Sequence, residues 1–491
     1  MTPTLPHSPA SRHYIACDLG AESGRVMLGT LTDGKLTLEE IHRFPNGPVV
    51  VQGTWRWDVL RMFDELKTGL RQVAERGLKI ESVSTDSWGV DYVWLKDREP
   101  LLTAPFHYRD LTRNDGAYER VFPLVSAAEI FAETGLQFMT LNTAYQLHWD
   151  VVNRPWIFKA ADRFLNIGDY FNYLFSGVAA AEQSLASTTQ LYNPKKKKWS
   201  RPLLKKLGLP KKLFPEIVPS GTVLGPAVPE LGLTGAQVVA SCSHDTGAAV
   251  AAVPAAGKGW AYLSSGTWSL LGVELKQPLI TDQSRQFNFT NEVGYGQSVR
   301  FLKNIIGLWI LQECRRQWGK PDYAELRQLA AQAAPLRSLI NPNDERFGKP
   351  GTMPEKISAF CRETGQPVPT TPGEFTRCIL ESLALLYRRT LEQLETCTGQ
   401  PVTTLHIVGG GSQNLLLNQF SANATGRTVI AGPAEATATG NILIQALALG
   451  QLTNLAELRQ VVRNSFAVQT YQPQDAAVWS QADGRFQKLI P

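Results

Sequence analysis

The order of apolar and polar residues along the first hundred positions predicts short strands and one long helix. The segments that fit strands are residues 14–17, 25–31, 35–44 and 80–85. Residues 18–24 fit a turn between the first two strands. Residues 58–76 place apolar side chains three and four positions apart, which predicts an amphipathic helix. Residues 90–95 fit a hairpin partner or an extension of the strand at 80–85.

The second half of the chain repeats this opening theme. Two apolar runs, residues 260–263 and 268–273, enclose the small-residue turn Ser264-Ser265-Gly266-Thr267. The pattern matches residues 17–29 although few residues are identical, so we interpret the two segments as an ancient duplication. Further expected elements are a helix at 375–394, a strand at 405–408, a glycine turn at 409–414, a helix at 415–425, a strand at 429–430 and a helix at 435–449.

Strand, turn and helix units in both halves predict an α/β fold with two domains, mixed sheets and a cleft between them. A chain of 491 residues is also too long for a single hydrophobic core. The predicted division is a flexible tail at 1–12, an N-terminal domain at 13–253, a linker or hinge at 254–259, a C-terminal domain at 260–455 and a C-terminal extension at 456–491.

Composition is that of an ordinary globular protein, with 43% hydrophobic and 19% charged residues. The net charge of +5 comes from scattered basic residues, so nucleic-acid binding is not indicated, and the run Lys195–Lys198 fits a solvated turn. No apolar stretch reaches the roughly 20 residues that span a bilayer, and the first twelve residues lack a signal core. These features predict a cytoplasmic protein without a membrane partner, and they imply no oligomeric partner.

The six cysteines show no metal-ligand spacing, which is typical of a protein from a reducing compartment. Cys361 and Cys378 flank a proline-rich loop and are candidates for a disulfide. Free thiols are the more common state in such a compartment, so the sequence leaves their pairing open.

A carboxylate surrounded by small residues stands in the segment Ser243-His244-Asp245-Thr246-Gly247. As a general base, Asp245 would lie within hydrogen-bond reach of a substrate hydroxyl. In the alternative, structural interpretation, Asp245 is the N-cap of a helix over 248–253. The two roles are compatible, because a helix N-terminus also favours an anion. His244 alone is more often a hydrogen-bonded structural histidine than a catalyst.

The turn Asp18-Leu19-Gly20-Ala21-Glu22-Ser23-Gly24-Arg25 fits a phosphate cradle. Its glycines let the backbone approach a ligand, Ser23 and Arg25 add donors, and Asp18 would face the metal that accompanies phosphates. The alternative is an ordinary hairpin with aspartate at the start of its turn.

Two further motifs follow predicted strands. Asp86-Ser87-Trp88-Gly89-Val90-Asp91-Tyr92 places carboxylates and an indole at a strand end, where α/β domains bind ligands, or else forms a surface turn with a buried Trp88. Gly409-Gly410-Gly411 permits close approach of a nucleotide but does not match the dinucleotide spacing G-x-G-x-x-G. The P-loop and protein-kinase motifs are absent from the sequence, which excludes those versions of phosphoryl transfer.

Taken together, these segments resemble the FGGY carbohydrate kinases from about Tyr14 to about Gly450. The stretches that carry the resemblance are Asp18-Leu19-Gly20 with Ser23-Gly24-Arg25, Asp86–Tyr92, Tyr108-Arg109-Asp110, Thr134–Phe138, Ala186–Leu191, Ser243–Thr246, Tyr262–Leu270, Asn288–Glu292, Phe301–Gln312, Gly409–Gln419 and Glu435–Asn441. The resemblance implies two ribonuclease-H-like domains of the actin and hexokinase type, which flank an active-site cleft that binds ATP.

The resemblance also implies site residues. It makes Asp245 the catalytic base and Asp18 the residue that helps to hold Mg²⁺, usually through water. It implies sugar contacts from Gly89, His244, Asp245 and Thr246. It implies phosphate and nucleotide contacts from Ala21, Glu22, Ser23, Gly24, Arg25, Thr267, Asn304, Gln312 and Gly411.

The sequence departs from the family pattern at two places. Glu22 stands where the family often has a small hydroxyl residue, so its side chain would have to turn away from the phosphates. After Tyr108-Arg109-Asp110 the family's arginine and threonine are transposed as Thr112-Arg113, and we therefore carry over no role for Arg113.

The activity implied is transfer of a phosphoryl group from ATP to the C1 hydroxyl of a ketose, with L-rhamnulose as the expected sugar. L-Fuculose and L-xylulose are alternatives, because differences of one methyl group in a pocket change the binding free energy by only ~1–3 kcal/mol. The wall residues that would decide between them are Trp88, Tyr92, Gln137 and Phe138. A non-catalytic sugar or nucleotide sensor on the same frame is the alternative from another class.

Overall fold

The computed structural model describes residues 11–102 and 104–490. The expected tail at 1–12 lies outside the described residues apart from Ser11 and Arg12, and strand β1 begins at Arg12. The chain packs as two compact units. Unit 1 comprises residues 1–254, 275–301 and 436–466, and unit 2 comprises residues 255–274, 302–435 and 467–491.

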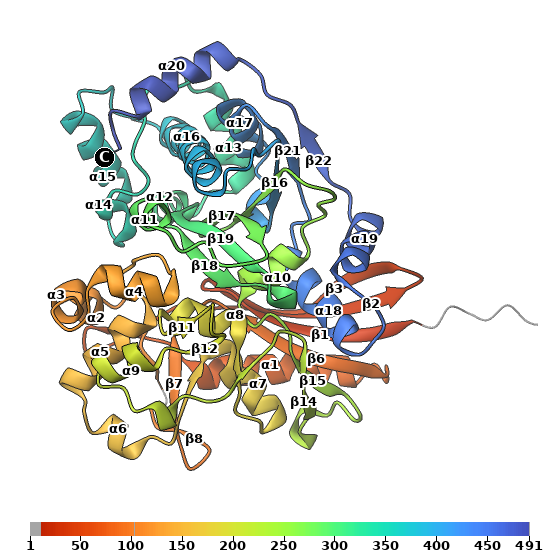
Figure 1. Ribbon diagram of the computed structural model, residues 1–491. Coiled ribbons are helices and arrows are strands. Elements are labelled where there is room, and N and C mark those ends of the chain that lie inside the picture. Colours follow the sequence, from red (N-terminus) through yellow and green to blue (C-terminus); the bar gives the residue numbers. More distant parts are fainter. Residues whose placement is uncertain (1–10, 103, 491) are drawn as a thin grey trace, which may run out of the picture. The chain divides into compact units, whose positions relative to one another are not determined.

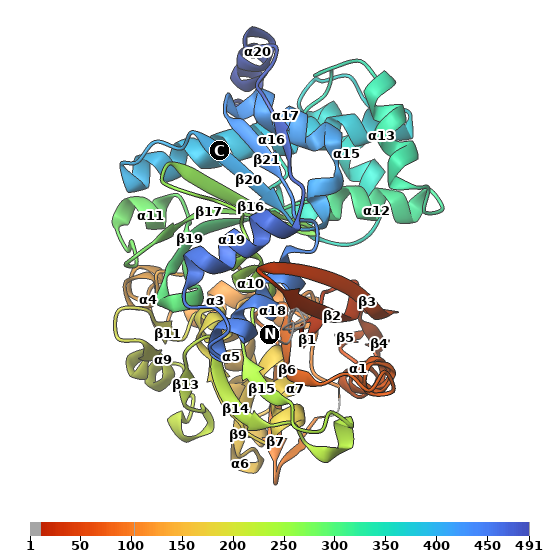
Figure 2. The same cartoon turned by 90° about the vertical axis from the view of Figure 1, so that its right-hand side faces the viewer.

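The first packing boundary, after residue 254, lies at the start of the linker expected at 254–259. Residues 275–301 and 436–466 follow the linker in sequence but pack with unit 1. The physical reason is apolar contact across the sequence: a Cβ added at Gly29 would meet the side chain of Ile442 at 2.7 Å. Figures 1 and 2 show α18 (Ala436–Ala448) beside β1 (Arg12–Leu19), from opposite ends of the chain.

Unit 1 contains a six-stranded sheet in the order β14-β15-β6-β1-β2-β3. The strands are β1, β2 (Ser23–Thr32), β3 (Lys35–Pro45), β6 (Ile80–Ser87), β14 (Thr222–Pro226) and β15 (Gln237–Ala240). Strand β1 pairs with β2 in antiparallel sense and with β6 in parallel sense. The helices that pack with this sheet are α1 (Val59–Ala74), α7 (Ile167–Ser176), α10 (Asp245–Ala251), α18 and α19 (Leu455–Ser465).

A second layer of unit 1 surrounds an aromatic core that includes Tyr92, Trp94, Phe164 and Trp199. Its strands are β4 (Val49–Val51), β5 (Thr54–Arg56), β7 (Tyr92–Lys96), β8 (Glu99–Pro100), β9 (Arg163–Asn166), β10 (Ala181–Glu182), β11 (Tyr192–Asn193), β12 (Lys198–Trp199), β13 (Ile217–Val218) and β18 (Thr290–Val293). Its helices are α2 (Leu111–Asn114), α3 (Ala117–Val121), α4 (Ala127–Thr134), α5 (Thr143–Asn153), α6 (Ile157–Ala160), α8 (Gln183–Ala186), α9 (Arg201–Lys206) and α11 (Asp282–Gln286).

The expected pairing of residues 90–95 with the strand at 80–85 is wrong. Strand β7 instead lies in a separate sheet of order β8-β7-β9. The chain turns between the two sheets at Val90, whose φ of +68° is left-handed. A β-branched residue rarely adopts this conformation, and here the hydroxyls of Thr143 and Thr188 bond its carbonyl and its amide.

A seven-stranded sheet has the order β18-β19-β17-β16-β20-β21-β22, and the strands from β17 to β22 together with most of β19 belong to unit 2. They are β16 (Trp260–Ser265), β17 (Trp268–Leu275), β19 (Val299–Ile306), β20 (Thr404–Val408), β21 (Thr428–Ala431) and β22 (Gln469–Tyr471). The helices are α12 (Trp309–Gln317), α13 (Tyr323–Gln332), α14 (Glu345–Gly348), α15 (Met353–Glu363), α16 (Pro372–Thr398), α17 (Leu415–Thr425) and α20 (Ala476–Phe486). Figure 2 shows α16 and α17 beside the strands of this sheet.

Helix α16 is longer than the expected 375–394 because its ends are capped. Thr371 and Glu374 form a reciprocal capping box, and Pro372 occupies the first turn. At the other end Gly399, with φ of +66°, closes the helix. The apolar stripe that predicted the helix defines its buried face, whereas these caps set its length.

The candidate disulfide between Cys361 and Cys378 is not formed. Cys361 and Cys378 are free thiols, and their side chains are joined by a hydrogen bond.

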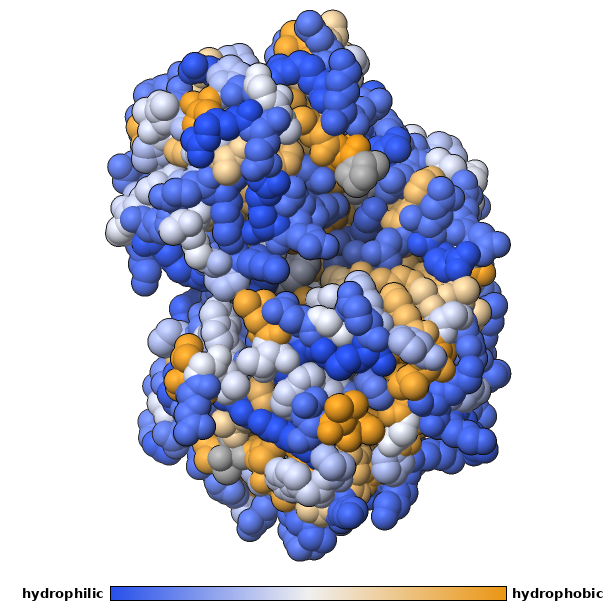
Figure 3. Space-filling model, turned by 90° about the vertical axis from the view of Figure 1, so that its left-hand side faces the viewer, coloured by the Kyte–Doolittle hydropathy of each residue, from blue (hydrophilic) through white to orange (hydrophobic). Residues whose placement is uncertain are grey.

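Among residues 11–102 and 104–490, no helix is long and apolar enough to cross a bilayer. Hydrophilic residues alternate with smaller apolar groups on the molecular face shown in Figure 3.

Candidate active site

The β1–β2 hairpin of unit 1 ends in the turn that was predicted to cradle phosphate. The amide of Gly20 donates to the carbonyl of Ser23 over 3.0 Å, which closes the turn. A Cβ on Gly24 would meet the ring of Phe44 at 2.1 Å, so only glycine fits there. The side chain of Glu22 is exposed at the tip of the turn. The Glu22 side chain can therefore turn toward solvent and away from the expected phosphate position.

Asp18 and Arg25 face each other across the hairpin and form an ion pair. On its other side Asp18 is in register with Asp86 of β6. Asp86 is fully buried, and it accepts a 2.6 Å hydrogen bond from the amide of Asn441 on α18. Burial, and then the charge of Asp18, raise the pKa of Asp86 well above its usual range.

Asp245 stands at the start of α10, one residue beyond the N-cap position. The N-cap interpretation is therefore wrong in detail: His244 occupies the cap position and makes no side-chain capping bond. Asp245 Oδ1 accepts hydrogen bonds from the amide and the hydroxyl of Thr246. Loss of solvent raises the pKa of Asp245; the neighbouring His244 opposes this rise, and the charge of Asp18 adds to it. The three carboxylates Asp18, Asp86 and Asp245 therefore share one region of unit 1.

His244 is tied to the neighbouring strand β6. The carbonyl of Ser243 accepts a 2.9 Å hydrogen bond from the amide of Ser87, and His244 forms a parallel bridge with Ser87. Gly89 follows two residues later, where an added Cβ would lie 2.9 Å from the hydroxyl of Thr188. The structure thus brings the predicted sugar contacts Gly89, His244, Asp245 and Thr246 to the ends of two adjacent segments.

An aromatic wall lies behind Gly89. Asp91 accepts hydrogen bonds from the indoles of Trp57 and Trp88, at 2.6 and 3.0 Å, and from the amide of Tyr108 at 3.1 Å. The Trp57 ring stacks on Trp88 and on His107, with centroid separations of 4.1 and 4.2 Å. Burial raises the pKa of Asp91 to about 6 and lowers that of His107 to about 3. The expected wall residue Trp88 is therefore held in place by a buried carboxylate.

Arg113, for which no role was carried over, is a structural residue. Its guanidinium is buried, lies 3.0 Å from Asp150 and donates to the hydroxyl of Tyr92 over 2.6 Å. Tyr92 in turn donates to Asp150 over 2.6 Å. The expected wall residue Tyr92 thus uses its hydroxyl within this cluster.

In unit 2 the β16–β17 hairpin repeats the geometry of β1–β2 with uncharged residues. The amide of Gly266 donates to the carbonyl of Trp268 over 2.9 Å. The carbonyls of Gly266 and Thr267 accept hydrogen bonds from the amides of Leu308 and Trp309, at 3.0 and 3.1 Å. This bonding attaches the turn to the start of α12. Thr267 and Gln312, which lies on the first turn of α12, are thereby brought close together.

The glycine turn at 409–411 packs directly on the same hairpin. Gly409 has φ of +84°, and a Cβ on Gly411 would lie 2.0 Å from the hydroxyl of Ser265. Gly410, between them, has no atom within 4 Å of an added Cβ. Asn304 lies on β19, the strand beside β17. The four predicted residues of unit 2 therefore lie on or beside a single hairpin.

Unit 2 also carries donor and acceptor groups suited to a nucleotide. Within residues 11–102 and 104–490, Gln312 Oε1 and the hydroxyl of Ser265 are buried without a hydrogen-bond partner. Buried polar atoms are rarely left without a partner, so these two fit a polar ligand. A turn of glycine and hydroxyl residues fits close approach of phosphate oxygens. The residues present therefore fit ATP.

The carboxylates of unit 1 fit a cation bound through water. In the part of the chain that the structure describes, no group of three or more His, Cys, Asp or Glu side chains is arranged to hold a metal ion. Mg²⁺ usually keeps several waters and takes only one or two carboxylates together with phosphate oxygens. Asp18 suits such an ion, and Asp86 Oδ1 is buried beside it without a partner among the described residues.

The sequence indicated Asp86 only as one of the carboxylates at a strand end, and it gave no role to Glu292, Arg300 and Asn441, which also support this site. Asp86, Glu292 and Asn441 lay in stretches that carry the resemblance, and Arg300 lies next to one. Their partners are far away in sequence, as the 355 positions between Asn441 and Asp86 illustrate. A charged residue among the apolar residues of a strand is a signal that marks Arg300, whereas Asp86 lies in a largely polar strand and has no such signal.

The family assignment follows from comparison with known proteins. Residues 13–252 match the model of the FGGY family of carbohydrate kinases, N-terminal domain, and residues 261–449 match its C-terminal domain. The chain therefore belongs to the FGGY family of carbohydrate kinases, as the sequence motifs predicted.

Comparison with individual proteins gives more detail than the family models. The chain is 45% identical to a rhamnulokinase of Bacteroides thetaiotaomicron, over 98% of this chain and 99% of that protein. It is 41% identical to a rhamnulokinase of Bacillus subtilis, over 94% of this chain and 96% of that protein. Among solved structures, a xylulose kinase of Lactobacillus acidophilus superposes with a TM-score of 0.81 at 17% identity and covers 97% of both chains. Glycerol kinase of Plasmodium falciparum superposes at 0.77, with 15% identity and 98% and 97% of the two chains covered. The predicted α/β fold class is confirmed.

Proposed function

We propose that this protein transfers the γ-phosphoryl group of ATP to the C1 hydroxyl of L-rhamnulose and releases L-rhamnulose 1-phosphate and ADP. The observation that carries the proposal is the position of Asp245, at the start of α10 beside His244 and in the same region as Asp18. A carboxylate in this place suits the base of an alcohol phosphorylation. The choice of L-rhamnulose is supported by the identity of 41–45% to rhamnulokinases.

The mechanism assigns one task to each group of residues. Phosphoryl transfer passes through a loose transition state, so it needs positioning and charge neutralisation more than covalent chemistry. Asp245 takes the proton of the C1 hydroxyl as the new bond to phosphorus forms. Gly89, His244 and Thr246 orient the sugar.

The two hairpin turns bind the phosphates of ATP. Ala21, Ser23, Gly24 and Arg25 act from unit 1 together with the backbone of Glu22, and Thr267 acts from unit 2. Asn304, Gln312 and Gly411 hold the rest of the nucleotide. Asp18 would hold Mg²⁺ through water, and this cation would supply neutralisation of phosphate charge.

A coupled assay of ADP release tests the proposal. Purified protein is given ATP and one sugar at a time: L-rhamnulose, L-fuculose, L-xylulose and no sugar. We expect the highest kcat/KM with L-rhamnulose, and product analysis should place the phosphate on C1. A higher value with another ketose would replace the substrate but keep the reaction. Absence of sugar-dependent ADP release with every ketose would favour the non-catalytic sensor instead.

A further inference from the structure

A buried ion pair lies directly behind His244 in unit 1. Arg300, on β19, is wholly buried, and Glu292, on β18, is 4% exposed. Arg300 Nη2 lies 3.1 Å from Glu292 Oε2, and Arg300 Nε donates to the carbonyl of Val293 over 3.2 Å. The same Nη2 makes a 3.0 Å hydrogen bond with Nδ1 of His244. The guanidinium thus contacts the acidic residue and the imidazole through one nitrogen.

This contact fixes the tautomer of His244. A guanidinium has only donors and keeps its proton in proteins, so His244 Nδ1 must accept the hydrogen bond. The ring of a neutral histidine then carries its proton on Nε2. Nε2 is the atom that faces the base, because it lies 3.4 Å from Asp245 Oδ1. The ring N–H group is therefore on the nitrogen that lies 3.4 Å from the carboxylate of the proposed base.

Glu292 has a second effect, opposed to that of Arg300. Its Oε2 atom lies 3.4 Å from His244 Nδ1, close enough to attract a proton to that nitrogen. Arg300 lies closer to Nδ1, at 3.0 Å, and donates a hydrogen bond to its lone pair. Glu292 in turn neutralises the buried guanidinium, which would otherwise be an uncompensated charge. The charged groups that face the imidazole are thus Arg300 from β19, Glu292 from β18 and Asp245 from α10.

We propose that Arg300 and Glu292 are positioning residues that hold His244 as the neutral Nε2–H tautomer. His244 is then a hydrogen-bond donor next to Asp245 and is not a second base. The kinetic part of this inference rests on the proposed function, in which Asp245 is the catalytic base. The tautomer itself is a property of the folded protein and does not depend on which sugar is phosphorylated.

Nitrogen NMR of ring-labelled histidine measures the tautomer directly. The His244 signals are assigned as those that disappear in the His244→Gln variant. In the wild type near pH 7.5 we expect His244 Nε2 to be protonated and Nδ1 to be unprotonated. A protonated Nδ1, in either the other tautomer or the cation, overturns the proposal.

The Arg300→Met variant should reverse the tautomer, because Glu292 then attracts the proton to Nδ1. For the same reason kcat should fall on the order of 10-fold or more and KM for the sugar should rise, while KM for ATP stays within about 2-fold. An unchanged tautomer, or an equal rise of both KM values, contradicts the proposal.

A double variant guards against simple misfolding of Arg300→Met. Arg300→Met with Glu292→Gln leaves no unpaired buried charge, and the amide introduced at position 292 can donate to Nδ1. We expect this variant to regain the Nε2–H tautomer and part of kcat. If it keeps the wild-type melting temperature but shows a protonated Nδ1, the assigned role of the donor is wrong.

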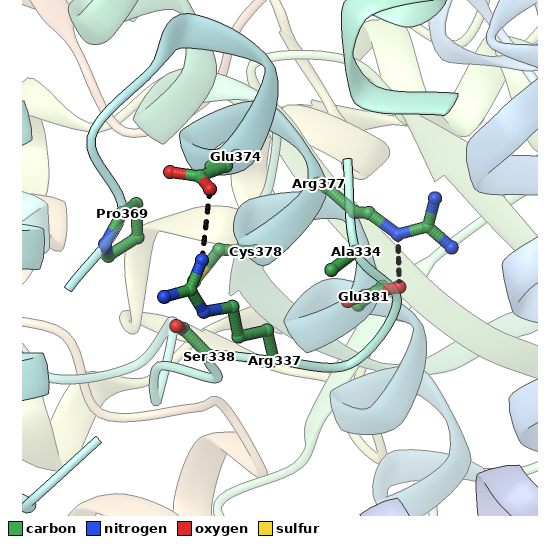
Figure 4. A pocket seen from close by; sticks show the side chains of 8 residues that line it. All are labelled: Ala334, Arg337, Ser338, Pro369, Glu374, Arg377, Cys378 and Glu381. Carbon is green, nitrogen blue, oxygen red and sulfur yellow. Dashed lines mark hydrogen bonds and ion pairs between the residues drawn. The ribbon is translucent and has the colours of Figure 1, made fainter. Parts of the chain in front are cut away.

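A matched control comes from another ion pair with a buried glutamate, in unit 2. Arg377 Nε lies 2.7 Å from Glu381 on α16, and the glutamate side chain is 1% exposed. Figure 4 shows this pair in the wall of a small pocket, together with the Arg337–Glu374 pair. Arg377→Met should lower the melting temperature without changing the His244 tautomer.

The NMR and kinetic results separate the two proposals. Wild-type protein that phosphorylates no ketose but shows the Nε2–H tautomer overturns the proposed function alone. Active wild-type protein with a protonated Nδ1 overturns the positioning inference alone.

Discussion

The sheets of the two units share one plan and differ in the residues at the tips of their strands. In unit 1, β1 pairs antiparallel with β2 and parallel with β6, and in unit 2, β16 pairs in the same senses with β17 and β20. The strand order β3-β2-β1-β6-β15-β14 therefore corresponds to β19-β17-β16-β20-β21-β22, and the second sheet has one additional strand, β18, beside β19. The repeated theme expected from residues 17–29 and 262–274 is present in the fold.

The strand register shows which residues of the two sheets correspond. Asp18 of β1 stands opposite Arg25 and Asp86, whereas Ser264 of β16 stands opposite Leu270 and Val408. At these three matched positions, unit 1 has the ionisable groups of Asp18, Arg25 and Asp86. Unit 2 has the hydroxyl of Ser264 and two apolar side chains in their places. Hydroxyls and backbone amides can approach a phosphate directly, whereas carboxylates repel it unless a cation neutralises them. The same scaffold therefore presents charged side chains at these positions in unit 1 and uncharged side chains in unit 2, a difference that supports the proposed roles of Asp18 and Thr267.

The sharpest test of this division is Asp245→Asn. We expect kcat to fall by on the order of 10²-fold or more, because the amide cannot take a proton from the sugar hydroxyl. Its oxygen can still accept the hydrogen bonds of Thr246, so the fold should persist. Affinity for ATP should stay near the wild-type value when measured by calorimetry. Near-normal turnover would exclude Asp245 as the base.

A second test perturbs only the hairpin of unit 2. Gly411→Ala places a methyl group 2.0 Å from the Ser265 hydroxyl, which must displace the β16–β17 turn. We expect a loss of ~1–3 kcal/mol in the free energy of unfolding and a higher KM for ATP. Gly410→Ala is the matched control, since its methyl group meets no atom within 4 Å. Equal effects of the two substitutions in thermal unfolding would argue against this packing.

A smaller effect is expected from Thr267→Val, which removes one hydroxyl and keeps the shape of the side chain. Loss of one hydrogen bond to a charged phosphate should raise KM for ATP roughly 10-fold, because such bonds contribute about 1.5 kcal/mol. The carbonyl that bonds Trp309 is unaffected. Initial rates at varied ATP and varied sugar separate the two constants. A change confined to the sugar would contradict the assignment of this turn.

The smallest expected effect concerns the aromatic wall of unit 1. Burial raises the pKa of Asp91 to about 6. Between about pH 4 and pH 6 the unfolded chain has released this proton while the folded protein keeps it, so Asp91 makes stability fall as pH rises. The free energy of unfolding of the wild type relative to Asp91→Asn should therefore decrease by on the order of 1 kcal/mol from pH 4.5 to pH 7. Denaturant unfolding at both pH values measures this, and an identical difference at the two would refute it.

The local pattern of apolar and polar residues was sufficient to predict the elements that are defined by their own apolar side chains. Residues 14–17 and 25–31 became β1 and β2, and the stripe over 375–394 became the buried face of α16. The turn at 264–267 was predictable for the same reason, since small residues between two apolar runs favour a hairpin. The phosphate and base motifs were visible because their residues lie within a few positions of each other.

Features that depend on distant residues could not be predicted in this way. Residues 90–95 look like the continuation of a hairpin, and only tertiary contacts at Val90 turn them into another sheet. His244 gives no local sign that Arg300, 56 positions later, determines its tautomer. Nor does any local pattern show that residues 275–301 pack with unit 1.

The alternation of the chain between its two units has a consequence for protein synthesis. A ribosome releases residues 1–254 first, yet α18 arrives only after most of unit 2 has been made. Until then Asp86 lacks the Asn441 amide, and the place that Ile442 fills beside Gly29 is empty. The nascent N-terminal segment must therefore wait, with part of its apolar surface exposed, for the last residues of its own core. A gene split after residue 254 would yield an N-terminal fragment that lacks two segments of unit 1 and a C-terminal fragment that carries unit 2 together with those segments.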